Sequence, residues 1–218
     1  IYHPGARGSH RRMNVTGQAP TRAAVLELMN EQVVVNEAYV FLDEKRLLLA
    51  SELLRQLTIF QRVKSELAGL QTSAKQAMRD ALMHHGLDGL QVYPPAALDG
   101  AEISQQTNNF MGVTLVEVEL NTSDVTQEHA VASNPSSAAQ RCIDLFRKIV
   151  VKSAMLSGVS GNLYRLLTEY RLTERRARAL ENVILPEIAQ SLRDMSAHLE
   201  ELDLEDAIRV RLQSRVKL

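Results

Sequence analysis

Glycine and proline are nearly absent from two long stretches of this chain. The sequence has 10 Gly and 6 Pro in 218 residues, and Gly69 alone among them lies between positions 21 and 85. In the stretch from 136 to 218 they are limited to Gly158, Gly161 and Pro186. Because these residues interrupt helices most strongly, their absence predicts two long helices that flank an irregular insert.

Residues 20–86 have the pattern of a first coiled-coil helix. Pro20-Thr21 is a plausible start, and Gly86 lies where a C-terminal glycine stop is expected. A helix of this length would extend roughly 98 Å, which is typical of a coiled coil. Its apolar seam follows intervals of three, four and seven and consists of Val25, Leu28, Val35, Leu42, Leu49, Leu53, Phe60, Val63, Leu67, Leu70, Ala74 and Ala77.

Residues 136–218 form the second expected helix, for which Asn134-Pro135 offers an N-cap followed by a favoured first residue. We expect the two seams to pack together in an antiparallel hairpin. Pro186 should kink this helix, and Gly158 with Gly161 predicts a break or a close approach by a partner. The second seam consists of Cys142, Leu145, Ile149, Leu156, Val159, Leu163, Leu166, Tyr170, Ala177, Leu180, Ile184, Ile188, Leu192, Met195, Leu199 and Leu202.

The insert, residues 87–135, contains the one segment with strand periodicity. Val116 to Leu120 alternates apolar and acidic residues, and Leu90 to Tyr93 is a weaker second strand, so a small hairpin is expected. The predicted fold class is therefore predominantly all-α: a long antiparallel two-helix coiled coil with a small central insert that contains a short β-hairpin.

Composition limits the functions open to the chain. A formal net charge of -1 argues against a nucleic-acid-binding protein, which normally has a large basic excess. One cysteine excludes an internal disulfide, and the apolar runs are too short to cross a bilayer, so we expect a soluble, cytoplasmic protein. Residues 1–19 are expected to be a disordered leader, of which 1–12 would precede a native start at Met13.

No pattern of enzyme chemistry is present. The glycine-rich phosphate loops with their lysine are missing, and we expect no cofactor and no catalytic residue. His84 and His85 are adjacent and cannot share a metal on one helix face, so no metal is expected and complementing the helix end is their simpler role. Cys142 has the spacing of a buried seam thiol. The acidic run at 200–206 is expected to be a solvated face, with Glu205 paired to Arg209.

One basic stripe is conspicuous on the second helix. Arg171, Arg175 and Arg178 follow i, i+4 and i+7 spacing, and Arg176 lies beside them. A solvated face and a docking surface both explain this pattern. We call the four residues the arginine cluster.

Several local motifs, in the same order and spacing, resemble the D subunit of the V-type and A-type rotary ATPases. The segment 19–22 (Ala-Pro-Thr-Arg) is similar to the opening of that family, and 41–46 (Phe-Leu-Asp-Glu-Lys-Arg) is similar to its Lys-Arg element. Met111-Gly112-Val113 before a strand resembles its Met-Gly-Val segment. The most specific match is 175–186, Arg-Arg-Ala-Arg-Ala-Leu-Glu-Asn-Val-Ile-Leu-Pro, although the family usually has Asn where this chain has Arg178.

The resemblance implies a mechanical role without catalysis. The chain would be the central rotor shaft of a proton- or sodium-translocating ATPase or ATP synthase, peripheral to the membrane and with no inserted segment. Its partners would be the catalytic and non-catalytic nucleotide-binding subunits A and B, the small F subunit of the stalk and the socket subunit of the membrane rotor. Candidate partner contacts are Arg22, Lys45, Arg46, Arg171, Arg175, Arg176, Arg178 and Glu181, and candidate shape-determining residues are Gly112, Gly158, Gly161 and Pro186.

A homodimeric coiled-coil scaffold or adaptor is the alternative function. Its seams would look the same in sequence, because composition and heptad spacing do not distinguish a shaft from a scaffold. The two differ in their partners, since a shaft is present in one copy within a larger assembly and a scaffold associates with itself.

Overall fold

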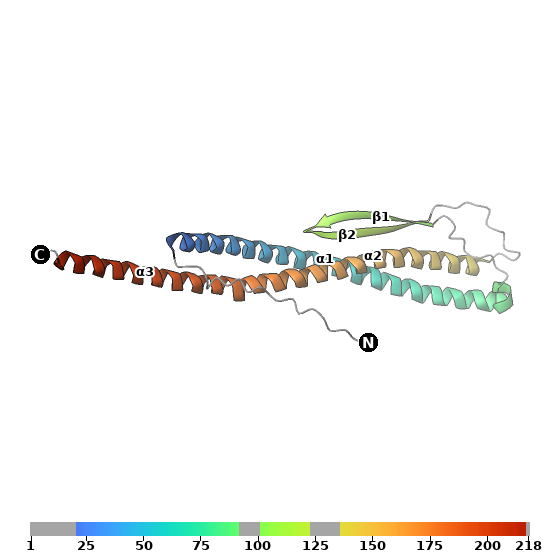
Figure 1. The fold of residues 1–218 in the computed structure, drawn as a ribbon. Helices are drawn as coiled ribbons and strands as arrows, with labels where there is room; N and C mark the ends of the chain where they lie inside the picture. The colour runs from blue at the N-terminus through green and yellow to red at the C-terminus, as the bar shows by residue number, and fades with distance from the viewer. Residues whose placement is uncertain (1–20, 92–100, 123–135, 217–218) are drawn as a thin grey trace, which may run out of the picture. The chain divides into compact units, whose positions relative to one another are not determined.

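The structure, a computed structural model, describes residues 21–91, 101–122 and 136–216 (Figure 1). The predicted leader therefore lies outside the described residues. The elements in chain order are helix α1 (Arg22–Gln91), strands β1 (Ala101–Phe110) and β2 (Val113–Thr122), helix α2 (Ser137–Ala179), the π-helical turn η2 (Leu180–Ile184) and helix α3 (Leu185–Val216).

The chain divides into two compact units. The terminal unit comprises Ile1–Glu44 and Glu174–Leu218, and the hairpin unit comprises Lys45–Thr173. In the terminal unit the buried apolar side chains include Ala24 and Leu28 on α1 and Ile188 on α3. An exposed ion pair joins α1 to α3 there.

Both long helical segments begin at a hydroxyl cap. Thr21 Oγ1 accepts a hydrogen bond from the backbone N–H of Ala24 at 3.2 Å, which agrees with the expected start of the first helix. Ser136 Oγ accepts from the N–H of Ala139 at 3.2 Å. Ser136 therefore caps the second helix in the structure, while Asn134 and Pro135, the predicted cap and first residue, lie outside the described residues.

Within the hairpin unit, α1 and α2 pair in antiparallel order. From one end to the other, His85 contacts Ser136, the Met78 and Cys142 sulfur atoms are 3.8 Å apart, and Glu66 pairs with Lys152. Lys45 pairs with Glu169 at the other end. Because rising residue numbers on α1 meet falling numbers on α2, the predicted antiparallel helix pair is confirmed.

The core of the hairpin unit joins both helices to the β-hairpin. Leu49 of α1 and Leu166 of α2 are fully buried, and they cluster with Val113 and Leu115 of β2. Every residue of the first predicted seam is buried or half-buried. In the second seam Ile184 and Leu202 are instead exposed.

The hairpin itself is regular. β1 and β2 pair without interruption from Phe110↔Val113 to Ala101↔Thr122. Met111 and Gly112 form the two-residue loop, with φ angles of 50° and 85°, as a type I′ turn requires. The strand predicted at 90–93 is wrong where it is described, because Leu90 and Gln91 belong to α1, and 92–93 lie outside the described residues.

Helix irregularities differ from the sequence expectations. Gly86, the expected end of the first helix, has a φ of 70°, and helical structure resumes beyond it to Gln91. The break predicted at Gly158 and Gly161 is wrong, since α2 runs through both residues. Near Pro186 the helix widens into η2, where the N–H of Leu185 bonds the Leu180 carbonyl. A π turn accommodates a proline, whose ring would otherwise crowd the carbonyl four residues earlier.

Candidate functional site

The arginine cluster is solvent-facing along α2. Arg171, Arg175, Arg176 and Arg178 are all exposed, and Arg178 donates a hydrogen bond to Glu174 at 2.6 Å. That contact is an i, i+4 pair on one helix, which is worth little in water. The cluster therefore keeps its positive charge available to a partner. Glu181, another candidate contact, is exposed in η2.

The side chains of the other candidate contact residues differ in their exposure and in their contacts within the chain. Arg22 donates to both carboxylate oxygens of Asp203, at 3.1 and 2.9 Å, in an exposed pair. Lys45 Nζ lies 2.7 Å from Glu169 Oε1, and the two side chains are only 15% and 26% exposed. The structure thus gives Lys45 an internal contact across the helix pair, and Arg46 is half-buried.

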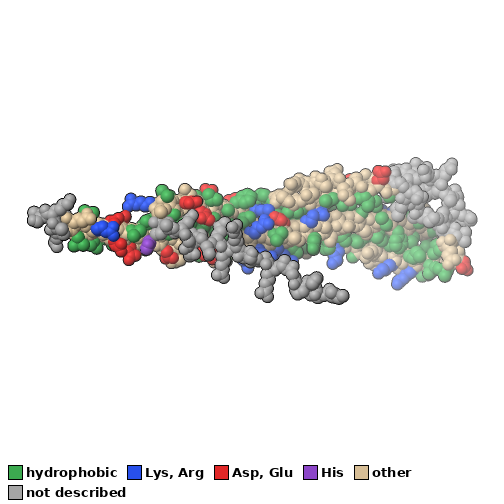
Figure 2. Space-filling model, in the orientation of Figure 1, with side chains coloured by type: hydrophobic (Ala, Val, Ile, Leu, Met, Phe, Trp, Pro, Cys, Tyr) green, Lys and Arg blue, Asp and Glu red, His purple; other side chains and the backbone are tan. Residues whose placement is uncertain are grey.

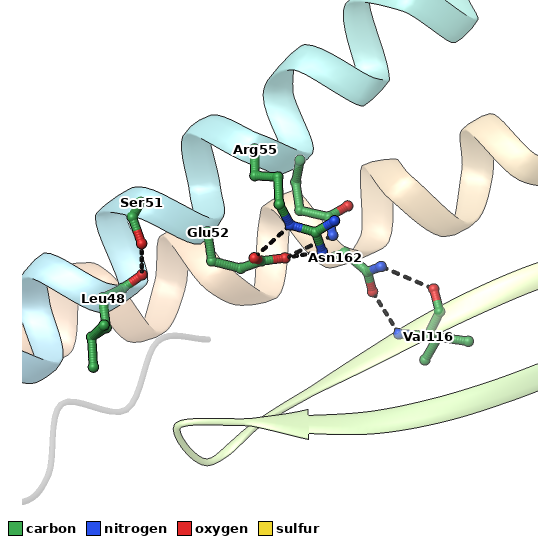
Figure 3. A network of polar contacts seen from close by, with 7 residues as sticks. Leu48, Ser51, Glu52, Arg55, Val116 and Asn162 are labelled. Atoms are coloured by element: carbon green, nitrogen blue, oxygen red, sulfur yellow. Dashed lines mark hydrogen bonds and ion pairs between the residues drawn. The ribbon is translucent and has the colours of Figure 1, made fainter.

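A buried carboxylate network lies on α1 next to the hairpin (Figure 3). Arg55 donates to both oxygens of Glu52 at 2.7 Å, and Gln56 Nε2 donates to Oε1 of Glu52 at 2.9 Å. The hydrogen bonds from Arg55 hold the pKa of Glu52 below its ordinary value, against the opposing effect of burial. Glu52 is therefore ionised and satisfied near neutral pH.

Asn162 of α2 fastens the hairpin to the helix pair (Figure 3). Its Oδ1 accepts from the backbone N–H of Val116 at 2.8 Å, and its Nδ2 donates to the Val116 carbonyl at 2.9 Å. Arg165 also donates to Oδ1 at 2.8 Å. One buried amide therefore satisfies both backbone groups of a β2 residue. Sequence analysis missed Asn162, because an asparagine in a helix carries no local signal of such a contact.

Gly158 allows the close approach of the hairpin to α2. A Cβ atom at this position would lie 2.8 Å from Cγ2 and 3.1 Å from Cβ of Val118. The close approach that the glycines suggested is thus made by the chain's own β2 strand. Gly161 lacks this constraint, because the nearest atom to a Cβ there would be an Arg165 side-chain nitrogen at 3.6 Å.

The described residues contain no arrangement suited to metal binding. No group of three or more His, Cys, Asp or Glu side chains in 21–91, 101–122 and 136–216 could hold an ion. Cys142 is buried, as predicted, and burial raises the pKa of its thiol. In the acidic run, Arg209 pairs with Asp206 at 3.6 Å rather than with the predicted Glu205. Within the same ranges, no helix is long and apolar enough to cross a bilayer.

Comparison with known proteins gives consistent matches over most of the chain. A family model described as the D subunit of ATP synthase matches residues 24–214. The D subunit of the V-type ATP synthase of Thermotoga neapolitana is 24% identical over 199 residues, which cover 91% of this chain and 98% of that protein. The D subunit of the A-type ATP synthase of Pyrococcus furiosus is 28% identical over 195 residues, covering 88% and 91%.

The D subunit of the A-type ATP synthase of Halobacterium salinarum is 25% identical over 195 residues, which cover 88% of this chain and 87% of that protein. The family match, residues 24–214, includes nearly all of the described residues of both units. The chain belongs to the family of ATP synthase D subunits, which are non-catalytic stalk subunits of the ATPase complex.

Proposed function

We propose that this chain is the central rotor shaft of a V/A-type rotary ATPase. It would transmit torque between the ring of nucleotide-binding subunits and the ion-translocating rotor in the membrane. The observation that carries the proposal is the antiparallel pairing of α1 and α2, with contacts between them at successive levels, in a chain whose family match runs from residue 24 to 214.

A packed helix pair with cross-contacts resists twisting, which torque transmission requires. Rotating one helix against the other would separate Lys45 from Glu169 and Glu66 from Lys152. The exposed Glu66–Lys152 pair contributes little stability, so the resistance comes mainly from close packing around Leu49 and Leu166 and from the largely buried Lys45–Glu169 pair.

Exposed apolar side chains support a role inside a larger assembly. They reach the surface along the described helices (Figure 2). On α1 the exposed residues Leu26, Val33, Val40, Leu47 and Leu54 recur at intervals of seven. Exposed apolar surface of this extent is typical of an interaction surface, and surrounding subunits would cover it.

The proposed partners are the ring subunits A and B, the small F subunit of the stalk and the socket subunit of the membrane rotor. The arginine cluster would face acidic loops of the ring. Arg22 at the start of α1 and Glu181 in η2 are also exposed and would add contacts. The chain would bind no nucleotide itself and would make the catalytic sites differ by its asymmetric position among them.

Stoichiometry tests this proposal against the scaffold alternative. The chain would be co-expressed with the F subunit and then with subunits A and B from the same genome, and the products weighed by gel filtration with light scattering. A one-to-one complex with the F subunit, and one copy in each ring, are expected. A homodimer that ignores the F subunit and the ring would overturn the proposal.

A further inference from the structure

Within the described residues, the outer edge of β1 has no strand paired with it. Asn162 takes both backbone groups of Val116, so these groups point away from β1. Along each strand of an antiparallel pair, the backbone N–H and C=O groups of successive residues point alternately toward the other strand and away from it. Two residues directly opposite each other have the same orientation: both point toward the other strand, or both point away. Thr107 lies opposite Val116, so its N–H and C=O point away from β2, as do those of Ile103, Gln105 and Asn109.

These outward groups have no hydrogen-bond partner within the described residues. Apart from bonds inside helices and strands, the backbone–backbone bonds found there join Val25 to Thr21 and Gln140 to Ser136. The side chains along this edge are also open to solvent, since Glu102, Ile103 and residues 105–109 are exposed.

The edge also lacks the features that usually protect edge strands. Proteins place lysine, proline or a bulge on such strands to prevent pairing with other chains. Residues 101–110 contain no Lys, Arg or Pro, and the pairing with β2 runs through without a bulge. The other edge of the hairpin, on β2, is held against α2 by Asn162 and Gly158. An unprotected edge of this length can bind an extended segment by strand addition.

We propose that the outer edge of β1 binds an extended, Lys- and Arg-bearing segment of another subunit of the ATPase complex, adding a third strand to the hairpin. This inference rests on the proposed function. Charge selects the occupant: the hairpin, residues 101–122, contains no Lys or Arg and carries the acidic residues Glu102, Glu117 and Glu119. A second copy of the chain would bring two acidic hairpins together, which like-charge repulsion opposes.

A proline substitution can test the outer edge alone, because it removes an outward hydrogen-bond donor without changing the pairing between β1 and β2. The N–H of Thr107 is not used by β2, so Thr107→Pro removes a donor from the outer edge while leaving the ladder bonds to β2 in place. Thr107→Val is the matched control, because it keeps the N–H and favours a strand. Protection of the Leu115 and Glu117 amides, which face β1, reports whether the hairpin of each variant stays folded.

Amide hydrogen exchange at single-residue resolution tests the inference, with the full chain alone and in the complex assembled with subunits A, B and F. The amides of Ile103, Gln105, Thr107 and Asn109 should exchange freely in the chain alone. In the assembled complex of the native chain and of Thr107→Val they should slow by at least about tenfold. In Thr107→Pro this gain should be lost at Gln105 and Asn109 while assembly persists.

Several outcomes would overturn the inference. Outward amides that stay unprotected in the native complex would show that no strand is added. Protection that already rises with concentration in the chain alone would identify a second copy as the occupant. If the slowing of amide exchange in the complex is unchanged in about 1 M salt, a basic segment is excluded as the occupant, since such salt screens charges beyond about 3 Å. If the chain fails to assemble with subunits A, B and F, the proposed function itself is wrong. If the chain assembles but the outward amides stay unprotected, the strand-addition inference alone is wrong.

Discussion

Asn162 is a single residue on which the position of the hairpin depends. Its side chain is buried and spans 46 residues of sequence to reach Val116. Nothing near Asn162 in the sequence marks this contact, since the helix pattern predicts only that the residue lies on α2. Heptad spacing finds apolar seams, but a polar contact between a helix and a strand depends on tertiary placement.

Replacing Asn162 with alanine should release the hairpin. The variant Asn162→Ala leaves both backbone groups of Val116 without a partner, and we expect a loss of about 1–3 kcal/mol in the free energy of unfolding. Urea unfolding measures this change. Tyr164→Ala is the control, because Tyr164 is 74% exposed on the same helix. Equal stability of the two variants would show that Asn162 does not anchor the hairpin.

Two glycines on the helices should respond oppositely to alanine. Gly69→Ala meets no atom within 4 Å, so better helix propensity should stabilise the chain by about 0.5–1 kcal/mol. Gly158→Ala would place a Cβ 2.8 Å from Val118, and the required shift of the hairpin should cost about 1–3 kcal/mol. Thermal unfolding compares them, and a stabilising Gly158→Ala would refute the close contact.

At the scale of elements, periodicity predicts the helices well and their irregularities poorly. The first seam is visible in the sequence because a helix presents every third or fourth residue to its partner. The π turn is not visible in this way: Pro186 predicts a disturbance of the helix, but the sequence does not indicate the wider turn at 180–184. Ile184, a predicted seam residue, lies in this turn and is exposed.

The strands illustrate another limit of sequence analysis. Val116 to Leu120 is recognisable because one side of the strand is apolar. β1 has no alternation, since Ile103 and its neighbours are largely exposed, and so the sequence favours 90–93 in its place. The better signal is the Met111-Gly112 pair, which allows a two-residue turn directly before the strand.

The turn should become more stable when its first residue suits a left-handed conformation. Met111 adopts a φ of 50°, which costs a methionine more than an asparagine. We expect Met111→Asn to stabilise the hairpin by several tenths of a kcal/mol, measured by exchange of the Val113 amide. A Gly112→Val control should destabilise it, because Gly112 has a φ of 85°. Faster exchange in Met111→Asn would contradict this turn geometry.

At the scale of the whole molecule, the arginine cluster should act in coupling rather than in folding. Replacing Arg171, Arg175, Arg176 and Arg178 with alanine should lower ATP-driven ion pumping in the reassembled complex, because an exposed basic surface for the ring would be lost. Helix content by circular dichroism should be unchanged. Arg141→Ala with Lys148→Ala, two exposed basic residues elsewhere on α2, is the control. Unchanged pumping in the cluster variant would remove the cluster from the interface.

The central claim is that this chain rotates within the ATPase. The most direct measurement attaches a bead to the chain through Met83→Cys, which replaces a residue that is 81% exposed. Cys142 is the single native cysteine, and its burial and raised pKa keep it from competing for the label. With the ring of A and B subunits fixed to a surface and ATP supplied, the account predicts that the bead rotates in one direction. A bead that stays still while the labelled complex hydrolyses ATP would contradict it.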